Sequence, residues 1–154
     1  MKDTFNIRYA KKSDIPEMTF LLSQLFEIEK DFCFVPEKHQ YSLSLMLESD
    51  NACILIACFK EKVVGMCTLQ WIISTAEGGC SGWVEDVIVD TPFRGKGVGS
   101  LLLSAVEEEA RKRDLVRLQL LYDQNNLLAC NFYLTRNWKI TRMSPLKKIL
   151  ISNP

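Results

Sequence analysis

The stretch VIVDTPFRGKGVGS, residues 87–100, decides the fold, because an apolar run changes within it to a glycine-rich turn and then to a helix. Three β-branched residues open the stretch, and glycines occupy positions 95, 97 and 99. The apolar residues that follow recur at helical spacing: Leu101, Leu102, Ala105 and Val106. The stretch therefore predicts a strand, a tight turn and an amphipathic helix in direct succession.

The predicted turn has the properties of an anion site. N–H groups at a helix N-terminus have no intrahelical acceptor and lie at the positive end of the helix dipole. Arg94 and Lys96 add positive charge, which favours a diphosphate. The turn alone leaves open that its glycines only permit a sharp bend and close helix packing. Its spacing matches neither Gly-x-x-x-x-Gly-Lys-Ser/Thr nor Gly-x-Gly-x-x-Gly, so nucleotide hydrolysis and dinucleotide binding lose support.

The rest of the chain supplies the elements around this unit. Apolar alternation and short apolar runs predict strands at 5–9, 52–59, 63–73, 83–89 and 116–120, with closing strands at 138–143 and 146–151. Helical spacing predicts helices at about 15–25, 36–49, from 98 onward, and 126–136. Residues 74–82, with three glycines, predict a loop. This order predicts an α/β fold in one domain, residues 1–154, with a mixed central β-sheet flanked by about four helices.

Composition excludes several classes of protein. Of 154 residues, 47% are hydrophobic, and 19 Lys and Arg balance 19 Asp and Glu, so we expect no nucleic-acid partner. The longest apolar run, residues 52–59, is far shorter than the roughly 18 residues of a transmembrane helix. The first residues lead into no apolar signal sequence. We therefore expect a cytoplasmic protein with no membrane segment.

The cysteines and the lone histidine limit the chemistry further. Six cysteines lie in apolar segments without any Cys-x-x-Cys pair, which favours reduced, buried thiols and no metal site. His39 is the only histidine, so a Ser-His-Asp or Cys-His mechanism would have to use it. Its polar neighbours in the sequence predict an exposed side chain.

Two motifs resemble a known family. Arg94-x-x-Gly97-x-Gly99, directly after a strand, resembles the acetyl-CoA signature Gln/Arg-x-x-Gly-x-Gly/Ala of the GNAT superfamily of N-acetyltransferases. The segment NLLACNFY, residues 126–133, is similar to the family's Asn-x-x-Ala-x-x-Phe-Tyr helix. The similarity is greatest over residues 83–140, although Asn137-Trp138 replaces the usual Gly-Phe. The resemblance implies a single-domain GNAT-like fold and an acetyl-CoA-dependent acyltransferase.

The resemblance also implies where acetyl-CoA binds as the acyl-donor cosubstrate. The backbone of Val87 and Val89 would pair with the pantetheine arm like an added strand. Asn126 would contact the arm or the adjoining ribose and phosphate region. The pyrophosphate would be held by the turn and the first helical residues, which are Arg94, Gly95, Lys96, Gly97, Val98, Gly99 and Ser100.

Transfer to an amine requires a base and an acid, because an alkylammonium ion with a pKa of about 10 does not attack a thioester. Glu85 resembles the glutamate that serves many GNAT enzymes as base. Its neighbour Asp86 points to the opposite face if the strand is regular, although a bulge would change that. Tyr133 resembles the residue beside the thioester sulfur and is the candidate acid, with a packing role as the alternative. No cysteine is needed as a nucleophile.

The functional hypothesis is an N-acetyltransferase that moves the acetyl group from acetyl-CoA to a primary amine of a small molecule or protein, by direct attack of the neutral amine. Aromatic and acidic residues at 26–34 suit a cationic amine with an apolar body, or else form a solvated surface over the core. One alternative is a non-catalytic acyl-CoA-binding sensor or regulatory domain, and another is a module for a different phosphate ligand. A homodimer through the C-terminal strands stays open.

Overall fold

The computed structural model describes residues 4–151, so the ends of the predicted single domain, 1–3 and 152–154, lie outside the described residues. The chain divides into two compact units, and the boundary in the sequence follows Leu121. The two units are described separately below. The first unit holds β1 (Phe5–Tyr9), η1 (Lys12–Asp14), α1 (Ile15–Ile28), α2 (Pro36–Glu48), β2 (Ala52–Phe59), β3 (Lys62–Ser74), β4 (Gly79–Val89), η2 (Thr91–Phe93), α3 (Val98–Lys112) and β5 (Arg117–Leu120). The second unit holds α4 (Leu127–Leu134).

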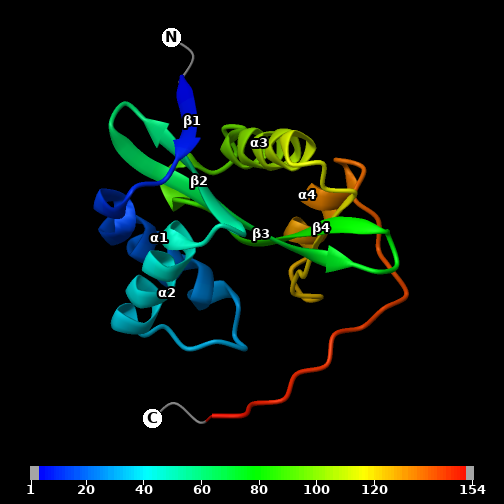
Figure 1. Cartoon of the computed structure of the whole chain (residues 1–154). Helices are drawn as coiled ribbons and strands as arrows, with labels where there is room; N and C mark the ends of the chain where they lie inside the picture. Colours follow the sequence, from blue (N-terminus) through cyan, green and yellow to red (C-terminus); the bar gives the residue numbers. More distant parts are fainter. Residues whose placement is uncertain (1–3, 152–154) are drawn as a thin grey trace. The chain divides into compact units, whose positions relative to one another are not determined.

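The predicted mixed sheet is confirmed within the described residues. Its five strands lie in the order β1-β2-β3-β4-β5. The first four pair antiparallel as consecutive neighbours, and β5 pairs parallel to β4 because α3 crosses between them (Figure 1). The sheet therefore has β5 as one edge, beside the strand that leads into the glycine turn.

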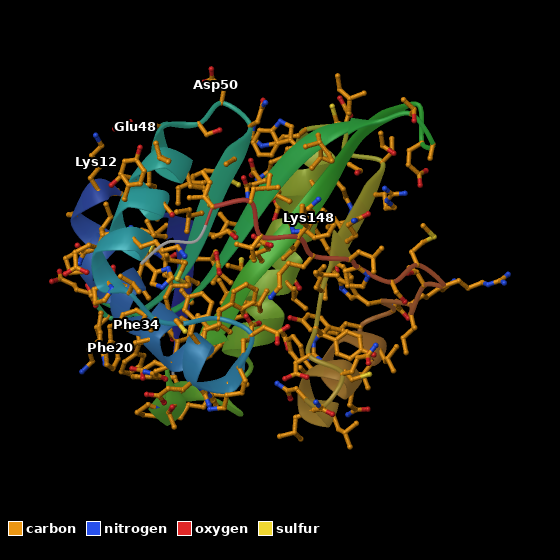
Figure 2. All side chains as sticks on the ribbon, turned by 90° about the horizontal axis from the view of Figure 1, so that it is seen from below. Lys12, Phe20, Phe34, Glu48, Asp50 and Lys148 are labelled. Carbon is orange, nitrogen blue, oxygen red and sulfur yellow. The ribbon has the colours of Figure 1, made fainter. Side chains whose placement is uncertain are left out.

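Helices cover both faces of this sheet, as Figure 1 shows, with α3 on one face and α1 and α2 side by side on the other. On the α3 face, Gly65 of β3 leaves room for Leu102, whose Cδ1 would lie 3.1 Å from an added Cβ. On the other face, apolar residues of α1 and α2 pack onto the strands in one buried cluster. Lys12 of η1 and Glu48 of α2 form an ion pair of 2.6 Å (Figure 2), which ties the start of α1 to the end of α2.

The prediction of a loop at 74–82 is wrong over its second half. Strand β4 begins at Gly79, which pairs with Ser74, and only residues 75–78 form the turn. Gly82 lies inside the strand because neighbouring leucines fill the place of a side chain: an added Cβ would lie 2.5 Å from Leu118 Cδ2. A glycine in a strand thus marks close packing here, and not a loop.

The two predicted closing strands are also wrong for the described part of the chain, because residues 138–151 form no strand. Several apolar side chains of this segment are 66% to 99% exposed: Ile140, Met143, Leu146, Ile149, Leu150 and Ile151. Apolar alternation predicts strands only where a partner strand exists. The homodimer through this segment remains a prediction.

The six thiols are all unpaired, and three of them, Cys53, Cys58 and Cys67, are buried. Cys33 is exposed, so the expectation of buried thiols is wrong at that position. Among residues 4–151 no three side chains of the metal-binding types come together as a ligand set. No helix in the same range has the length and apolar composition to cross a membrane.

Candidate functional site

A β-bulge shapes the second half of β4. Between the pairs Met66↔Ile88 and Thr68↔Glu85, β4 contains one residue more than β3. Asp86 takes up the extra length with a φ of 52°, a left-handed conformation that is uncommon for a residue with a side chain. The strand is thus not regular here, so the expected opposite facing of Glu85 and Asp86 does not apply, and both residues line one pocket.

From the bulge onward, β4 is not paired with β5. Pairing between the two strands ends at Val84↔Leu120, five residues before β4 ends. The N–H of Asp90 donates to the carbonyl of Val64 in β3 at 2.8 Å. By alternation, the main-chain groups of Val87 and Val89 point to the opposite edge, away from β3. This edge is the feature that pairing with an extended ligand requires.

The glycine turn follows this open edge. Gly95 and Gly97 have φ of 73° and 85°, and at either position an added Cβ would have no neighbour within 4 Å. The turn therefore requires glycine for its backbone conformation and leaves space above it. Helix α3 begins at Val98, so the N–H groups of its first turn point toward that space, as the sequence predicts. The Nζ atom of Lys96 lies 5.5 Å from the centre of the Phe93 ring, beside the turn.

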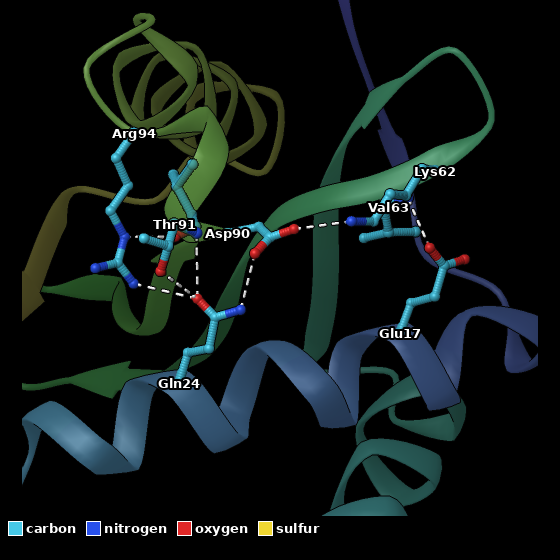
Figure 3. Close-up of polar contacts among 8 residues, drawn as sticks. Glu17, Gln24, Lys62, Val63, Asp90, Thr91 and Arg94 are labelled. Carbon is cyan, nitrogen blue, oxygen red and sulfur yellow. Dashed lines mark hydrogen bonds and ion pairs between the residues drawn. The ribbon is translucent and has the colours of Figure 1, made fainter.

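Gln24 of α1 holds the segment between β4 and the turn, an interaction that the sequence analysis missed (Figure 3). Its Nε2 donates to Asp90 at 2.8 Å, and its Oε1 accepts from the N–H and hydroxyl of Thr91 at 3.2 and 3.0 Å. Lys62 closes the network with an ion pair of 2.9 Å to Asp90. Gln24 is one of several polar residues on α1, and nothing in the sequence shows that η2 lies against this helix.

Arg94 folds back over the end of β4. Its Nε donates to the carbonyl of Val89 at 2.8 Å, and an Nη lies 3.4 Å from Gln24 Oε1 (Figure 3). The guanidinium is thus fixed beside the open edge and the glycine turn. A ligand that pairs with the carbonyl of Val89 must replace this bond.

A pocket of about 170 Å³ lies on the sheet face that α1 and α2 cover. Glu85 and Asp86 come from β4, and the other lining residues come from the two helices: Leu22, Phe26, His39, Ser42, Leu43 and Met46. None of these residues is a lysine or arginine. The pocket therefore presents an acidic wall opposite an apolar and aromatic one.

The two carboxylates differ in their surroundings. Glu85 is exposed and accepts a hydrogen bond from Trp83 Nε1 at 2.9 Å. Asp86 is half-buried, and burial, with the charge of Glu85 as a smaller cause, raises its pKa to about 6. The hydroxyl of Thr68 donates to Asp86 at 3.1 Å and partly opposes this rise in the pKa.

The raised pKa makes the stability of the fold depend on Asp86 and pH. Because the folded protein holds this proton more tightly than the unfolded chain, the favourable contribution is complete below pH 3.8 and is lost as the pH rises through about 6. We expect Asp86→Asn to melt at a higher temperature than the parent at pH 8. The free energy of unfolding should be larger by up to about 3 kcal/mol. The difference should shrink at pH 4.

Thermal melts of both proteins from pH 4 to pH 8 test this expectation, with Asp31→Asn as the control, since Asp31 is exposed. A difference between Asp86→Asn and parent that stays constant with pH would mean that the carboxyl is not desolvated.

The other two predicted site residues, Asn126 and Tyr133, belong to the second unit, so their distances from the glycine turn stay predictions. Asn126 caps α4, because its Oδ1 accepts from the N–H of Ala129 at 3.0 Å. The ring of Tyr133 meets the rings of Phe132 and Trp138 edge-on, with centroids 5.3 and 5.9 Å away. The helix predicted at 126–136 is confirmed as α4.

The prediction of an exposed His39 is wrong. Its imidazole is half-buried between the rings of Phe26 and Phe34, with centroids 4.8 and 5.3 Å away. Phe34 lies on the connection between α1 and α2. Phe26 and Phe34 thus pack against the histidine, which the polar neighbours of His39 in the sequence do not predict.

Comparison with known proteins identifies the family. A sequence model of the Acetyltransferase (GNAT) family matches residues 22–137, which cover both units and both predicted motifs. The chain belongs to this family and is an acetyl-CoA-dependent acetyltransferase, an enzyme class that transfers acyl groups from acetyl-CoA to amines.

One curated relative and two solved structures are similar to most of this chain. The chain is 26% identical over 133 residues to the aminoalkylphosphonate N-acetyltransferase of Salmonella typhimurium, with 86% of this chain and 84% of that protein covered. A possible acetyltransferase from Clostridium difficile has the same fold, with a TM-score of 0.85 at 18% identity over 96% of this chain and 99% of that one. A predicted acetyltransferase from Clostridium acetobutylicum, solved with acetyl-CoA, gives a TM-score of 0.80 at 16% identity, covering 96% and 97%.

Proposed function

We propose that this protein acetylates a small primary alkylamine, by direct attack of the neutral amine on the thioester of acetyl-CoA. The observation that carries the proposal is the bulge at Asp86. Both residues at the bulge, Glu85 and Asp86, line one pocket, and the pairing of β4 with β5 stops at Val84, just before the bulge. An acceptor in the pocket and an extended donor along the edge would thus meet at the same strand.

Acetyl-CoA would be held by main chain and by positive charge. The pantetheine arm is proposed to pair with Val87 and Val89, whose main-chain groups point away from β3. The pyrophosphate would lie over the glycine turn, residues 94–100, where space, helix N–H groups and the charge of Lys96 coincide. Asn126 is proposed to contact the donor from the second unit.

The proposed chemistry needs no covalent enzyme intermediate. The ammonium loses a proton to Glu85, which is exposed and can pass it to water. The amine nitrogen then forms a bond to the acetyl carbon, the carbon–sulfur bond breaks, and the departing thiolate takes a proton from Tyr133. The amide nitrogen releases its surplus proton to solvent, and Tyr133 takes a proton back from solvent, which completes the transfer. Asp86, half-buried beside Glu85, is proposed to hold the ammonium as its counter-ion.

The pocket limits the class of amine. Its volume of about 170 Å³ is smaller than the roughly 300 Å³ at which drug-sized sites begin, so it suits a short aliphatic chain. Two carboxylates and no lining cation disfavour an acceptor that carries an anionic group. The Salmonella relative is named for aminoalkylphosphonates, which combine an amine with an anion. We propose that this protein instead prefers an amine without one.

Release of CoA thiol from acetyl-CoA tests this function, with propylamine and 3-aminopropylphosphonate as acceptors of equal chain length. We expect kcat/KM to be at least tenfold higher for propylamine, since like-charge contact in a partly buried pocket costs more than about 1.4 kcal/mol. Equal rates with both amines would contradict the proposed substrate class. The absence of thiol release with every primary amine would contradict the proposed function.

The assignment of Glu85 gives a sharper expectation. Glu85→Gln should lower kcat about a hundredfold while the KM for acetyl-CoA stays within twofold, because a positioned base contributes that much to transfer. Asp86→Asn is the matched control, and it should mainly raise the KM for the amine. Steady-state kinetics at pH 8 decide between the two carboxylates: a large loss of kcat in Asp86→Asn alone would assign the base to Asp86.

A further inference from the structure

His39 lines the pocket, and the proposed chemistry does not use it. It lies in the first turn of α2, on the helical wall of the pocket, whereas Glu85 and Asp86 come from the strand. Its Nε2 is buried and has no hydrogen-bond partner among the described residues. A buried polar atom without a partner costs about 1–3 kcal/mol, a cost that a hydrogen-bond donor reaching Nε2 would recover.

The surroundings of the ring define what that group must be. The backbone of Cys33 hydrogen-bonds the imidazole and favours its charged form, which identifies the carbonyl as the acceptor. Since Nε2 has no partner, this bond belongs to Nδ1, which therefore carries the proton. Burial is the largest effect and lowers the pKa of His39 below its usual 6.5. At neutral pH the Nε2 atom is thus an unprotonated acceptor, and it requires a donor.

The rings of Phe26 and Phe34 hold this acceptor in place. They lie against the imidazole, with the Phe34 ring inclined by 18° to it, so the ring has little freedom to turn Nε2 elsewhere. The other polar side chain on the α2 wall is Ser42, whose hydroxyl already donates to the carbonyl of Lys38 at 3.0 Å. The Nε2 atom of His39 is therefore the buried side-chain atom of this wall that has no partner among the described residues.

We propose that His39 selects acceptors with a second hydrogen-bond donor, a hydroxyl or a second amino group, a few carbons from the amine that is acetylated. Its Nε2 receives that donor on the helical wall, while the reacting amine lies at Glu85 and Asp86. This inference rests on the proposed function and narrows its substrate class from alkylamines to amino alcohols and short diamines.

Paired acceptors of the same length test the inference. We expect kcat/KM for 3-aminopropanol to exceed that for propylamine at least tenfold in the parent protein, because a buried hydrogen bond that only one of them makes is worth about 1.5 kcal/mol or more. In His39→Phe, which keeps the ring between Phe26 and Phe34, the ratio should fall to about one. In Ser42→Ala the ratio should stay as in the parent.

A second variant and a binding measurement guard against an effect of misfolding. His39→Asn keeps a donor for the carbonyl of Cys33 and should lose the preference as His39→Phe does. Because the chain has a single histidine, the ¹⁵N resonances of its imidazole report on this site alone. The Nε2 resonance of the parent protein with CoA should move when 3-aminopropanol is added, and should move less with propylamine.

The outcomes separate this inference from the function on which it rests. If propylamine is acetylated but the preference for 3-aminopropanol is missing in the parent, or persists in both His39 variants, the role of His39 is overturned and the alkylamine acetyltransferase stands. If no amine is acetylated by a folded parent protein, the proposed function fails first.

Discussion

Gly97→Glu is expected to raise the Kd for CoA at least a hundredfold while the protein stays folded. Gly97 precedes α3 with a φ of 85°, and an added Cβ meets no atom within 4 Å. The new side chain therefore has room, and it places a carboxylate where the turn is proposed to hold a pyrophosphate. Repulsion between these anions, added to the loss of space, removes the binding energy of the site.

Any side chain at this position also lowers the stability of the folded protein, because a left-handed residue other than glycine costs roughly 1–2 kcal/mol. Gly78→Glu measures that cost alone. Gly78 has a φ of 67°, also has open space around it, and lies in the turn before β4, whereas Gly97 follows the other end of that strand. Both variants should lower the melting temperature similarly, and only Gly97→Glu should lose CoA.

Thermal melts with and without CoA read out both effects at once. Ligand at 100 times its Kd adds about 2.7 kcal/mol, which is several degrees for a chain of this length. We expect that shift in the parent and in Gly78→Glu and none in Gly97→Glu. A full shift in Gly97→Glu would show that the turn does not hold the phosphates.

Those parts of the fold that depend on local pattern were predictable from the sequence. The glycine turn and α3 follow from residues 87–106, since β-branched residues, glycines and a helical stripe each act over a few positions. The mixed sheet follows from the order of these elements, because a helix between two strands makes them parallel. The two motifs that carry the family resemblance lie in such local segments.

The acceptor side of the site depends on contacts that the sequence does not display. The side of the sheet to which Asp86 points depends on the one extra residue that β4 has relative to β3. The alternation of residues along β4 does not reveal this bulge. The burial of His39 comes from Phe26 and Phe34, on α1 and on the connection between α1 and α2, and the polar sequence around it predicts exposure. Gln24 likewise gains its role only when α1 packs beside η2. Long-range packing thus decides the residues that would choose the amine.

The C-terminal segment also shows that local sequence pattern and long-range packing decide different features of the fold. Alternating apolar residues at 146–151 predict a strand, yet strand formation needs a neighbour that supplies main-chain partners. Leu146 is 99% exposed, so the apolar pattern in this segment is left without the burial that normally accompanies it. The apolar alternation predicts that the segment favours an extended conformation. Whether it forms a strand depends on a neighbouring strand that supplies main-chain hydrogen bonds.

Tyr133→Phe is expected to lower kcat at least tenfold while the Kd for CoA stays within twofold. The ring packs edge-on against Phe132 and Trp138, and phenylalanine keeps both contacts. Only the hydroxyl is removed, and in the proposed mechanism that hydroxyl gives its proton to the departing thiolate. A positioned acid is worth on the order of a hundredfold or more, part of which solvent can replace.

Tyr122→Phe is the matched control within the same unit, because the Tyr122 hydroxyl hydrogen-bonds Cys130 and has no proposed part in transfer. Its kcat should remain within twofold of the parent. Single-turnover acetylation of propylamine, with the Kd for CoA taken from melts, separates transfer from binding. If Tyr133→Phe loses affinity for CoA as much as rate, the tyrosine packs the site and another group protonates the thiolate. If rate and affinity are both unchanged, the thiolate takes its proton from water.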